Sequence, residues 1–317
     1  MAIAIGVDIG GTFTDLIAYD EAAGEIWHAK SSTTPHHLAD AIFDCIAKAG
    51  LHPQSIFDVV HGTTVAINTA IERTGARTAL LVTQGTRDVY AIGRGNRPEA
   101  YNIFFRRAEP LVPRHLTFEV QERLLASGEV LVPLNTEALA PVADQLKKEK
   151  VEAVAVCLLH AFTNPAHELA VGTFLQSSVG EACYLSLSHE IMRQYGEYER
   201  ISTTVLNAYI GPKVKGYLED LAHRLEQAGI QGHLYIMQSN GGVMTPETAM
   251  RKPVTLMESG PVGGIIASAL VGSHLGFPNV IAFDMGGTTA KASLIQDGEP
   301  TMAPGYYIGG YASGHPA

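Results

Sequence analysis

The strongest constraint in this 317-residue sequence is a short motif that occurs twice. Residues 7–15 read V-D-I-G-G-T-F-T-D and residues 283–291 read F-D-M-G-G-T-T-A-K, so both copies contain a D-x-G-G-T core. Each core follows an apolar run typical of a β-strand, and the paired glycines let the backbone turn sharply. A single glycine pair is typical of an ordinary hairpin, but a repeated strand–turn–strand device indicates a duplicated fold.

The chemistry of these turns points to bound phosphate. Successive backbone N–H groups that point one way form a nest for anions, and a threonine hydroxyl adds a further donor. The predicted phosphate-binding residues are Gly10, Gly11, Thr12, Thr14, Gly286, Gly287, Thr288, Thr289 and Lys291. Asp8 and Asp284, at the strand ends, are the predicted catalytic carboxylates and ligands of a hydrated Mg²⁺ (or Mn²⁺) ion that bridges phosphates. Asp15, the counterpart of Lys291, either assists the metal or lies at a solvated edge.

Two other kinds of nucleotide site are excluded. The sequence contains no G-x-x-x-x-G-K-[ST] P-loop. The G-G-T turn leads into a further strand, whereas a dinucleotide fingerprint is G-x-G-x-x-G at the start of a helix.

The remaining pattern is that of an α/β protein. A predicted three-strand meander covers residues 2–30, and a helix follows at 36–49. Strand-like runs at 78–83, 153–159 and 184–187 alternate with helical stretches, which favours mixed sheets with flanking helices. The segment 198–227 is predicted to be helical, with a break or kink at Gly211-Pro212. We predict two domains, 1–182 and 198–317.

Composition limits the classes of binding partner and the cellular compartment that are expected. The chain is 46% hydrophobic and has a net charge of −10, which is unfavourable for binding nucleic acid. Its three cysteines have no C-x-x-C spacing, so they are expected to be buried thiols of a reducing cytoplasm. The apolar stretch 259–283 is interrupted by proline and glycines, which predicts a buried helix and strand and no membrane span.

Several further motifs are candidates for the site. His61 precedes Gly62-Thr63-Thr64 and either contacts substrate or phosphate as a catalytic group or hydrogen-bonds within a turn. Asn68 is expected on the same wall. Residues 239–242 (S-N-G-G) either hold substrate or form an ordinary turn. Residues 258–261 (E-S-G-P) precede a predicted helix at 262–275, whose free N–H groups favour a phosphate or carboxylate. An arginine cluster at 94–114 either grips an anionic substrate or partner or is a charged surface loop.

Five motifs in the same order carry a more specific resemblance. They are V-D-I-G-G-T-F-T-D at 7–15, H-G-T-T-V-A-I-N-T at 61–69, Q-S-N-G-G-V-M at 238–244, E-S-G-P-V-G-G at 258–264 and F-D-M-G-G-T-T-A-K at 283–291. Together they resemble the hydantoinase A and 5-oxoprolinase family, within the superfamily of actin, Hsp70 and sugar kinases. The resemblance implies actin-like ATPase (ribonuclease H-like) lobes.

The resemblance also implies a function. Members of this family use ATP to phosphorylate a carbonyl-derived oxygen, so we expect an ATP-dependent cyclic amide hydrolase, or a carboxylase acting on a ketone. A hydantoinase B-type subunit is the implied partner. Two alternatives stay open: a small-molecule kinase of the same superfamily, and a nucleotide-binding module without catalysis. Family members are usually about twice as long as this chain.

Overall fold

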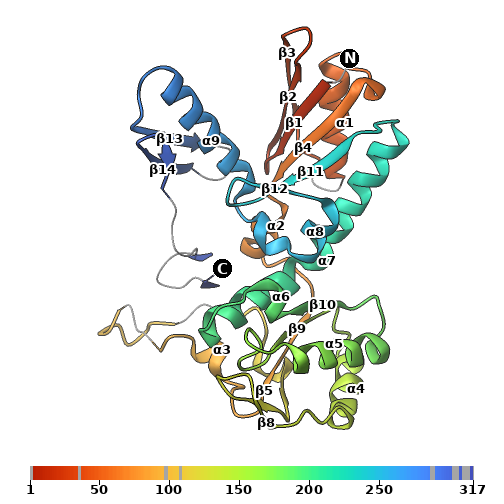
Figure 1. The fold of residues 1–317 in the computed structure, drawn as a ribbon, viewed down its shortest axis with the longest axis vertical. Helices are drawn as coiled ribbons and strands as arrows, with labels where there is room; N and C mark the ends of the chain where they lie inside the picture. The colour runs from red at the N-terminus through yellow and green to blue at the C-terminus, as the bar shows by residue number, and fades with distance from the viewer. Residues whose placement is uncertain are drawn as a thin grey trace. The chain divides into compact units, whose positions relative to one another are not determined.

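The computed structural model describes residues 3–34, 37–95, 99–106, 109–285 and 290–301, and the backbone of 307–308 and 315–316. The chain forms two compact units (Figure 1). Unit 1 comprises residues 1–68 and 214–304, and unit 2 comprises residues 69–213 and 305–317. These units do not coincide with the predicted domains 1–182 and 198–317, because the chain returns to unit 1 within the long helix α7 (Glu197–Gln227).

A six-stranded sheet in the order β12-β11-β4-β1-β2-β3 forms the centre of unit 1. Its first three strands are the predicted antiparallel meander, and β4 and β11 continue the sheet in parallel with β1. The bounds are β1 (Ile3–Ile9), β2 (Phe13–Asp20), β3 (Glu25–Ser32), β4 (Ile56–Thr63), β11 (His233–Met237) and β12 (Val243–Met244).

Period-two alternation decides which side chains of β1 enter the core. The odd-numbered residues of β1 are buried, and they pack with α1 (Leu38–Lys48) and with the last turns of α7 through Ile42, Leu221 and Leu225. Since neighbouring side chains of a strand point to opposite faces, Asp8 faces away from this core. Unit 1 also contains α8 (Pro246–Arg251) and the short 3₁₀ turns η1 (Pro53–Ser55) and η4 (Pro253–Leu256).

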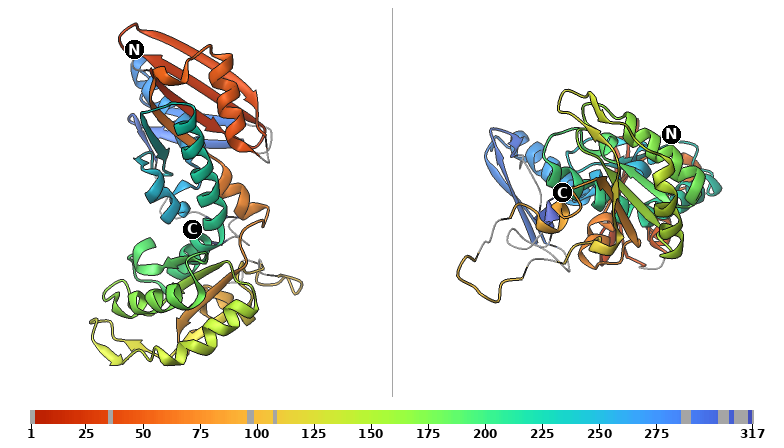
Figure 2. Two further views of the ribbon diagram at one scale, coloured as in Figure 1. Left: turned by 90° about the vertical axis from the view of Figure 1, so that its right-hand side faces the viewer. Right: turned by 90° about the horizontal axis from the view of Figure 1, so that it is seen from below.

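The second signature lies in a small antiparallel sheet of unit 1. It consists of β13 (Val280–Met285), β14 (Ala290–Gln296) and β15 (Glu299–Pro300), and α9 (Ser259–His274) packs beside it (Figure 2). Asp284 pairs with Lys291 across β13 and β14, in the register that pairs Asp8 with Asp15 across β1 and β2. The two copies of the motif therefore also share the same strand pairing. Ile281, Phe283 and Met285 of β13 are more than 60% exposed.

Unit 2 is built on a parallel sheet in the order β10-β9-β5-β6. Its two central strands are wholly buried, as expected for a parallel sheet covered on both faces. The strands are β5 (Thr78–Thr83), β6 (Thr117–Val120), β9 (Ala153–Cys157) and β10 (Tyr184–Leu187), with a hairpin of β7 (Arg123–Leu124) and β8 (Val130–Val132). The helices are α2 (Val65–Ile71), which begins in unit 1, α3 (Val89–Ile92), α4 (Ala140–Lys148), α5 (Ala166–Val179), α6 (Ser188–Ile191), and the 3₁₀ turns η2 (Arg114–Leu116) and η3 (Glu137–Leu139). Short backbone pairs β16 (Tyr307–Ile308) and β17 (His315–Pro316) complete the chain.

The predicted break at Gly211-Pro212 is wrong, because α7 continues through both residues. Gly211 sits against the ring of Tyr184, where an added Cβ would lie 2.4 Å from a ring carbon. Burial of apolar side chains such as Ile210 and Val214 on both sides of Pro212 outweighs the roughly 3 kcal/mol that a helix-interior proline costs. No helix in the described part of the chain combines the length with the hydropathy that a bilayer crossing demands.

A buried carboxylate organises the carboxyl-terminal edge of the unit 2 sheet. Glu168 of α5 is fully buried and accepts hydrogen bonds from the backbone N–H of Leu158 (2.9 Å) and the hydroxyl of Ser188 (2.6 Å). Its other oxygen accepts from the backbone N–H (3.0 Å) and Nδ1 (2.7 Å) of His189. Arg200 of α7 donates to the same Ser188 hydroxyl. These contacts tie β9, β10, α5 and α7 together.

We predict that Glu168→Gln lowers the free energy of unfolding by about 3 kcal/mol, because an amide has one acceptor oxygen and leaves buried donors unpaired. Urea unfolding followed by circular dichroism measures the change. The matched control is Glu190→Gln on α6, whose side chain is exposed and should shift stability by less than about 0.5 kcal/mol. Equal effects of the two substitutions would contradict this account.

Candidate functional site

Asp8 lies where three strands of unit 1 meet. It is opposite Asp15 across the antiparallel pair and opposite Gly62 across the parallel pair with β4. The H-G-T-T motif thus enters the site through its glycine: a Cβ on Gly62 would lie 3.1 Å from Oδ1 of Asp8.

The E-S-G-P motif reaches the same carboxylate from α9. A Cβ on Gly260 would lie 2.5 Å from Oδ1 of Asp8, so only glycine fits there without displacing the carboxylate. Ser259 fixes this approach, because its buried hydroxyl donates to the backbone oxygen of Thr63 (3.1 Å) and accepts from the Thr63 N–H (3.2 Å). Gly62, Ser259 and Gly260 lie within motifs that the sequence analysis identified, but it did not predict their contacts with Asp8 and Thr63. The glycine within H-G-T-T and the glycine within E-S-G-P were the sequence signals that could have indicated a close backbone approach.

Charges from both signatures act on Asp8. Solvent reaches its side chain, yet crowding of the carboxylate by protein atoms raises its pKa to about 6, with further raising by the negative charges of Asp15 and Asp284. Lys291 and Lys30 act in the opposite direction. Asp8, Asp284 and Lys291 thus lie within electrostatic reach of one another, so the structure brings together the described parts of the two signatures.

The two counterpart residues Asp15 and Lys291 have different partners. Asp15 forms an exposed ion pair with Lys30 of β3, at 2.7 Å. Lys291 forms an ion pair with Glu258, the residue before α9, and both side chains are largely buried. Glu258 has a left-handed backbone, with φ of 63°, which is uncommon for a residue with a side chain.

The first G-G-T turn is tight, and its residues differ in accessibility. The Gly10 N–H donates to the backbone oxygen of Phe13 (3.0 Å), while Gly11 and Thr12 are exposed. Thr14 faces the core, fully buried, and its hydroxyl lies 3.1 Å from that of Thr33. Gly286, Gly287, Thr288 and Thr289, the predicted second turn, lie outside the described residues.

His61 is completely buried within the sheet. Its Nδ1 lies 3.2 Å from the backbone oxygen of Val7, and its Nε2 lies 2.7 Å from the hydroxyl of Tyr217 on α7. A neutral imidazole that donates from Nδ1 to Val7 accepts at Nε2 from Tyr217. Burial lowers the pKa of His61 to about 4. Nearby, Thr64 donates to the last carbonyl of β1, at Ile9, and Asn68 donates to Thr64.

The oxygen donors at the site suit a hard cation. Across the part of the chain that the structure describes, no group of three or more His, Cys, Asp or Glu side chains converges as a metal site. Mg²⁺ commonly takes one or two protein carboxylates and completes its shell with water and phosphate oxygens. Asp8 and Asp284 match that requirement, and the glycines beside Asp8 leave one side of its carboxylate without side chains.

The other predicted candidates make contacts of their own. Ser239 donates to the backbone oxygen of Thr255 in η4 (2.9 Å), and the Gly242 N–H donates to the Asn240 side chain within the turn (2.9 Å), so both groups already have protein partners. Of the arginine cluster in unit 2, Arg94 pairs with Glu199 and Arg114 pairs with Asp88.

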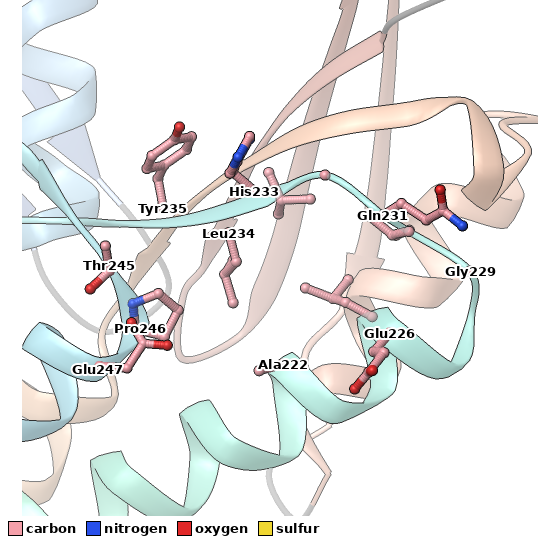
Figure 3. Close-up of a pocket in the computed structure, with 14 residues that line it drawn as sticks. Ala222, Glu226, Gly229, Gln231, His233, Leu234, Tyr235, Thr245, Pro246 and Glu247 are labelled. Atoms are coloured by element: carbon pink, nitrogen blue, oxygen red, sulfur yellow. The ribbon is translucent and has the colours of Figure 1, made fainter.

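Unit 1 also contains a pocket of about 710 Å³ away from these residues. Figure 3 shows it between the end of α7, β11 and the start of α8, where Glu226, Tyr235 and Glu247 contribute to the lining. None of the predicted site residues lines it.

We predict that Gly260→Ala lowers the free energy of unfolding of unit 1 by about 1–3 kcal/mol, because the new methyl group overlaps the Asp8 carboxylate. Gly264→Ala in the same helix is the matched control. It has open space around its Cβ position and should raise stability by up to about 1 kcal/mol. Urea unfolding monitored by the fluorescence of Trp27 measures both, and stabilisation by both substitutions would refute the close approach.

A second prediction concerns the stability of the protein at acid pH. An unfolded histidine binds a proton below about pH 6.5, whereas buried His61 stays neutral down to about pH 4, so its contribution to stability is present above pH 6.5 and is lost as pH falls. Between pH 7 and pH 4, wild type should lose about 3 kcal/mol relative to His61→Asn. Unfolding at a series of pH values measures this difference. With exposed His52→Asn as the control, a pH-independent difference for His61→Asn would contradict a buried neutral imidazole.

Comparison with known proteins identifies the family. Residues 4–179 match the family model described as the hydantoinase/oxoprolinase N-terminal region, and residues 200–317 match the hydantoinase/oxoprolinase model. An uncharacterised protein of Methanocaldococcus jannaschii is 39% identical over 98% of this chain and 46% of its own length. The alpha subunit of the caprolactamase of Pseudomonas jessenii is 34% identical over 94% of this chain and 44% of its own length.

Solved structures show the same fold. A nucleotide-free structure of acetone carboxylase, from work on ATP-dependent acetone carboxylation, matches with a TM-score of 0.84 at 28% identity, over 94% of this chain and 45% of its own. The ATP-dependent caprolactamase of Pseudomonas jessenii matches with a TM-score of 0.79 at 32% identity, over 92% and 43%. The fold is therefore of the actin-like ATPase type, as predicted. This chain spans about half the length of these relatives, and it belongs to the hydantoinase/oxoprolinase family.

Proposed function

We propose that this chain carries the phosphate-binding part of a cytoplasmic, ATP-dependent enzyme that phosphorylates the oxygen of a cyclic amide, or of an enolate derived from a ketone. The observation that carries the proposal is that residues 258–260 contact both signatures. Gly260 abuts the Asp8 carboxylate and Glu258 pairs with Lys291, so this segment joins Asp8 to Lys291 and to its cross-strand neighbour Asp284. Two register-matched copies of one strand–turn–strand device supply these residues. The ATP dependence of the caprolactamase and the acetone carboxylase supports the same assignment.

ATP solves a specific chemical problem in such a reaction. An amide resists hydrolysis because resonance strengthens its C–N bond and makes its carbonyl carbon a poor electrophile. Transfer of the γ-phosphoryl group to the carbonyl oxygen releases ADP and turns the oxygen into a phosphate leaving group. One water then adds to the activated carbon, and the ring C–N bond breaks as the nitrogen is protonated to an amine. A second water releases phosphate and leaves a carboxylate. With a phosphorylated enolate, water cleaves the O–P bond to release phosphate, and the enolate carbon forms a bond to CO₂.

The residues have distinct proposed roles. Asp8 and Asp284 hold Mg²⁺ or Mn²⁺, which supplies charge neutralisation at the phosphates. Gly10, Gly11 and Thr12 present donors to phosphate from the first turn, and Gly286, Gly287, Thr288 and Thr289 do so from the second. Lys291 neutralises phosphate charge.

For His61 and Thr14 we propose positioning roles in place of direct contact. His61 joins the backbone of β1, one residue before Asp8, to Tyr217 of α7. Thr14 contacts Thr33, whose hydroxyl donates to the backbone oxygen of Gly10 (2.9 Å). Both side chains thus fix the backbone that carries Asp8 and the first turn.

The proposed substrate is a small cyclic amide such as a hydantoin or lactam, or a ketone. Completion of the reaction is assigned to a second, hydantoinase B-type subunit. Support for a partner comes from the caprolactamase relative, which is itself named as an alpha subunit.

Calorimetry of ATP binding with Mg²⁺ tests the phosphate site. We expect Asp8→Asn and Asp284→Asn each to weaken ATP binding at least about tenfold, because each removes a carboxylate ligand of the cation. A tenfold loss of affinity is about 1.4 kcal/mol of binding free energy. Asp8→Asn should also raise the stability of the nucleotide-free protein above pH 6, since it removes a carboxylate that its neighbours disfavour.

Asp297→Asn is the matched control for this series. Asp297 lies in the turn between β14 and β15 with φ of 52°, a conformation that asparagine tolerates, and its substitution should leave ATP affinity unchanged. Equal ATP affinity in wild type and in all three variants would contradict the proposed phosphate site. Binding without turnover in the presence of hydantoins, lactams and ketones would favour a nucleotide-binding module, and transfer to a hydroxyl would favour a kinase.

A further inference from the structure

Glu258 is a charged residue held in a costly conformation beside the candidate site. Its backbone has φ of 63°, which residues with a side chain adopt rarely, and its carboxylate pairs with Lys291 of the second signature. The exposed fractions of the two side chains are 28% for Lys291 and 17% for Glu258. A conformation of this kind persists only where surrounding contacts hold it.

Those surrounding contacts are the next two residues of the chain. Ser259 is fixed to the backbone of Thr63 by two hydrogen bonds, and Gly260 abuts the Asp8 carboxylate. The backbone of Glu258 therefore cannot move far without disturbing the contact between Gly260 and the Asp8 carboxylate. Its carboxylate is held at a fixed place from which it contacts Lys291.

The charges around this ion pair are mainly negative. Asp15 faces Asp8 across β1 and β2, and Asp284 faces Lys291 across β13 and β14. Glu258 adds a fourth carboxylate, which is paired with the lysine. A polyphosphate that approached Lys291 would meet an ammonium group already paired with Glu258. Phosphate oxygens carry more charge than one carboxylate, and they compete with Glu258 for the same ammonium group.

We propose that Glu258 is a positioning residue that holds Lys291 in place and yields it to the polyphosphate tail of the nucleotide. The proposal rests on the proposed phosphate site and deepens it. In the nucleotide-free protein, Glu258 neutralises the lysine and keeps it beside Asp8. On binding, the ammonium passes from the carboxylate to a phosphate oxygen, so the Glu258–Lys291 contact is broken at a cost to affinity.

A double-mutant cycle with two ligands tests this exchange. ATP and inorganic tripolyphosphate, each with Mg²⁺, are titrated into wild type, Glu258→Gln, Lys291→Gln and the double variant. Glu258→Gln keeps the shape of the side chain and removes its competing charge, so it should tighten the binding of both ligands about threefold to tenfold. Lys291→Gln should weaken them about tenfold or more. The double variant should match Lys291→Gln, because Glu258 acts only through the lysine.

Other results separate the possible failures. Unchanged or weaker binding by folded Glu258→Gln overturns the exchange but leaves the phosphate site intact, as does tightening of the same size in the Lys291→Gln background. No binding of either ligand to wild type overturns both proposals. Exposed Glu247→Gln in the same unit is the control for a general charge effect, and equal tightening by it also counts against the exchange. Circular dichroism establishes that each variant is folded.

Discussion

The contact between the Asp8 carboxylate and two glycine backbones sets the rest of unit 1. Parallel pairing of β1 with β4 places Gly62 opposite Asp8, and the hydrogen bonds of Ser259 to Thr63 bring Gly260 to its other side. A side chain at either glycine would occupy the space of the carboxylate. Three segments from distant parts of the sequence are therefore constrained together: the first D-x-G-G-T core, the H-G-T-T motif and the E-S-G-P motif. The start of α9, and with it the second signature, is fixed by the same contact.

This packing has an electrostatic cost that a cation can reverse. Crowding and two further carboxylates disfavour the ionised form of Asp8 in the nucleotide-free protein. A divalent ion would turn the same concentration of negative charge into a favourable field, since opposite charges at close range stabilise the ionised form. Residues that reduce stability in one state and bind in another are typical of functional sites. His61 serves the opposite purpose: buried and neutral, with both ring nitrogens hydrogen-bonded, it stabilises the strands that carry the charged residues.

Local pattern predicted the regular elements well, and contacts between distant segments account for what it missed. The bounds of β5 and β10 are those predicted, because short apolar runs flanked by turn residues leave little choice. The repeated motif also predicted a duplication, and the two copies do share one strand pairing. The sequence did not predict the continuity of α7 through Pro212, which depends on burial along both halves of the helix. Nor did it predict that His61 and Thr14 point into the core, because H-G-T-T is equally typical of a turn and Thr14 was assigned to the phosphate-binding turn. The close approach of Gly260 to Asp8 joins residues some 250 positions apart, beyond the reach of any periodicity.

The two signature copies have diverged at one position that matters for an anion. In the first copy, Asp15 faces Asp8 across the sheet, a like-charge pair that Lys30 relieves from β3. In the second copy, Lys291 faces Asp284, and its ammonium reaches Glu258. One copy thus contributes net negative charge and the other contributes a cation. A symmetric pair of acidic copies would bind a metal ion but repel the phosphates that accompany it. In the proposed phosphate site, lysine at this position of the second copy would supply the charge that the phosphates need, and the structure pairs that lysine with the carboxylate of Glu258.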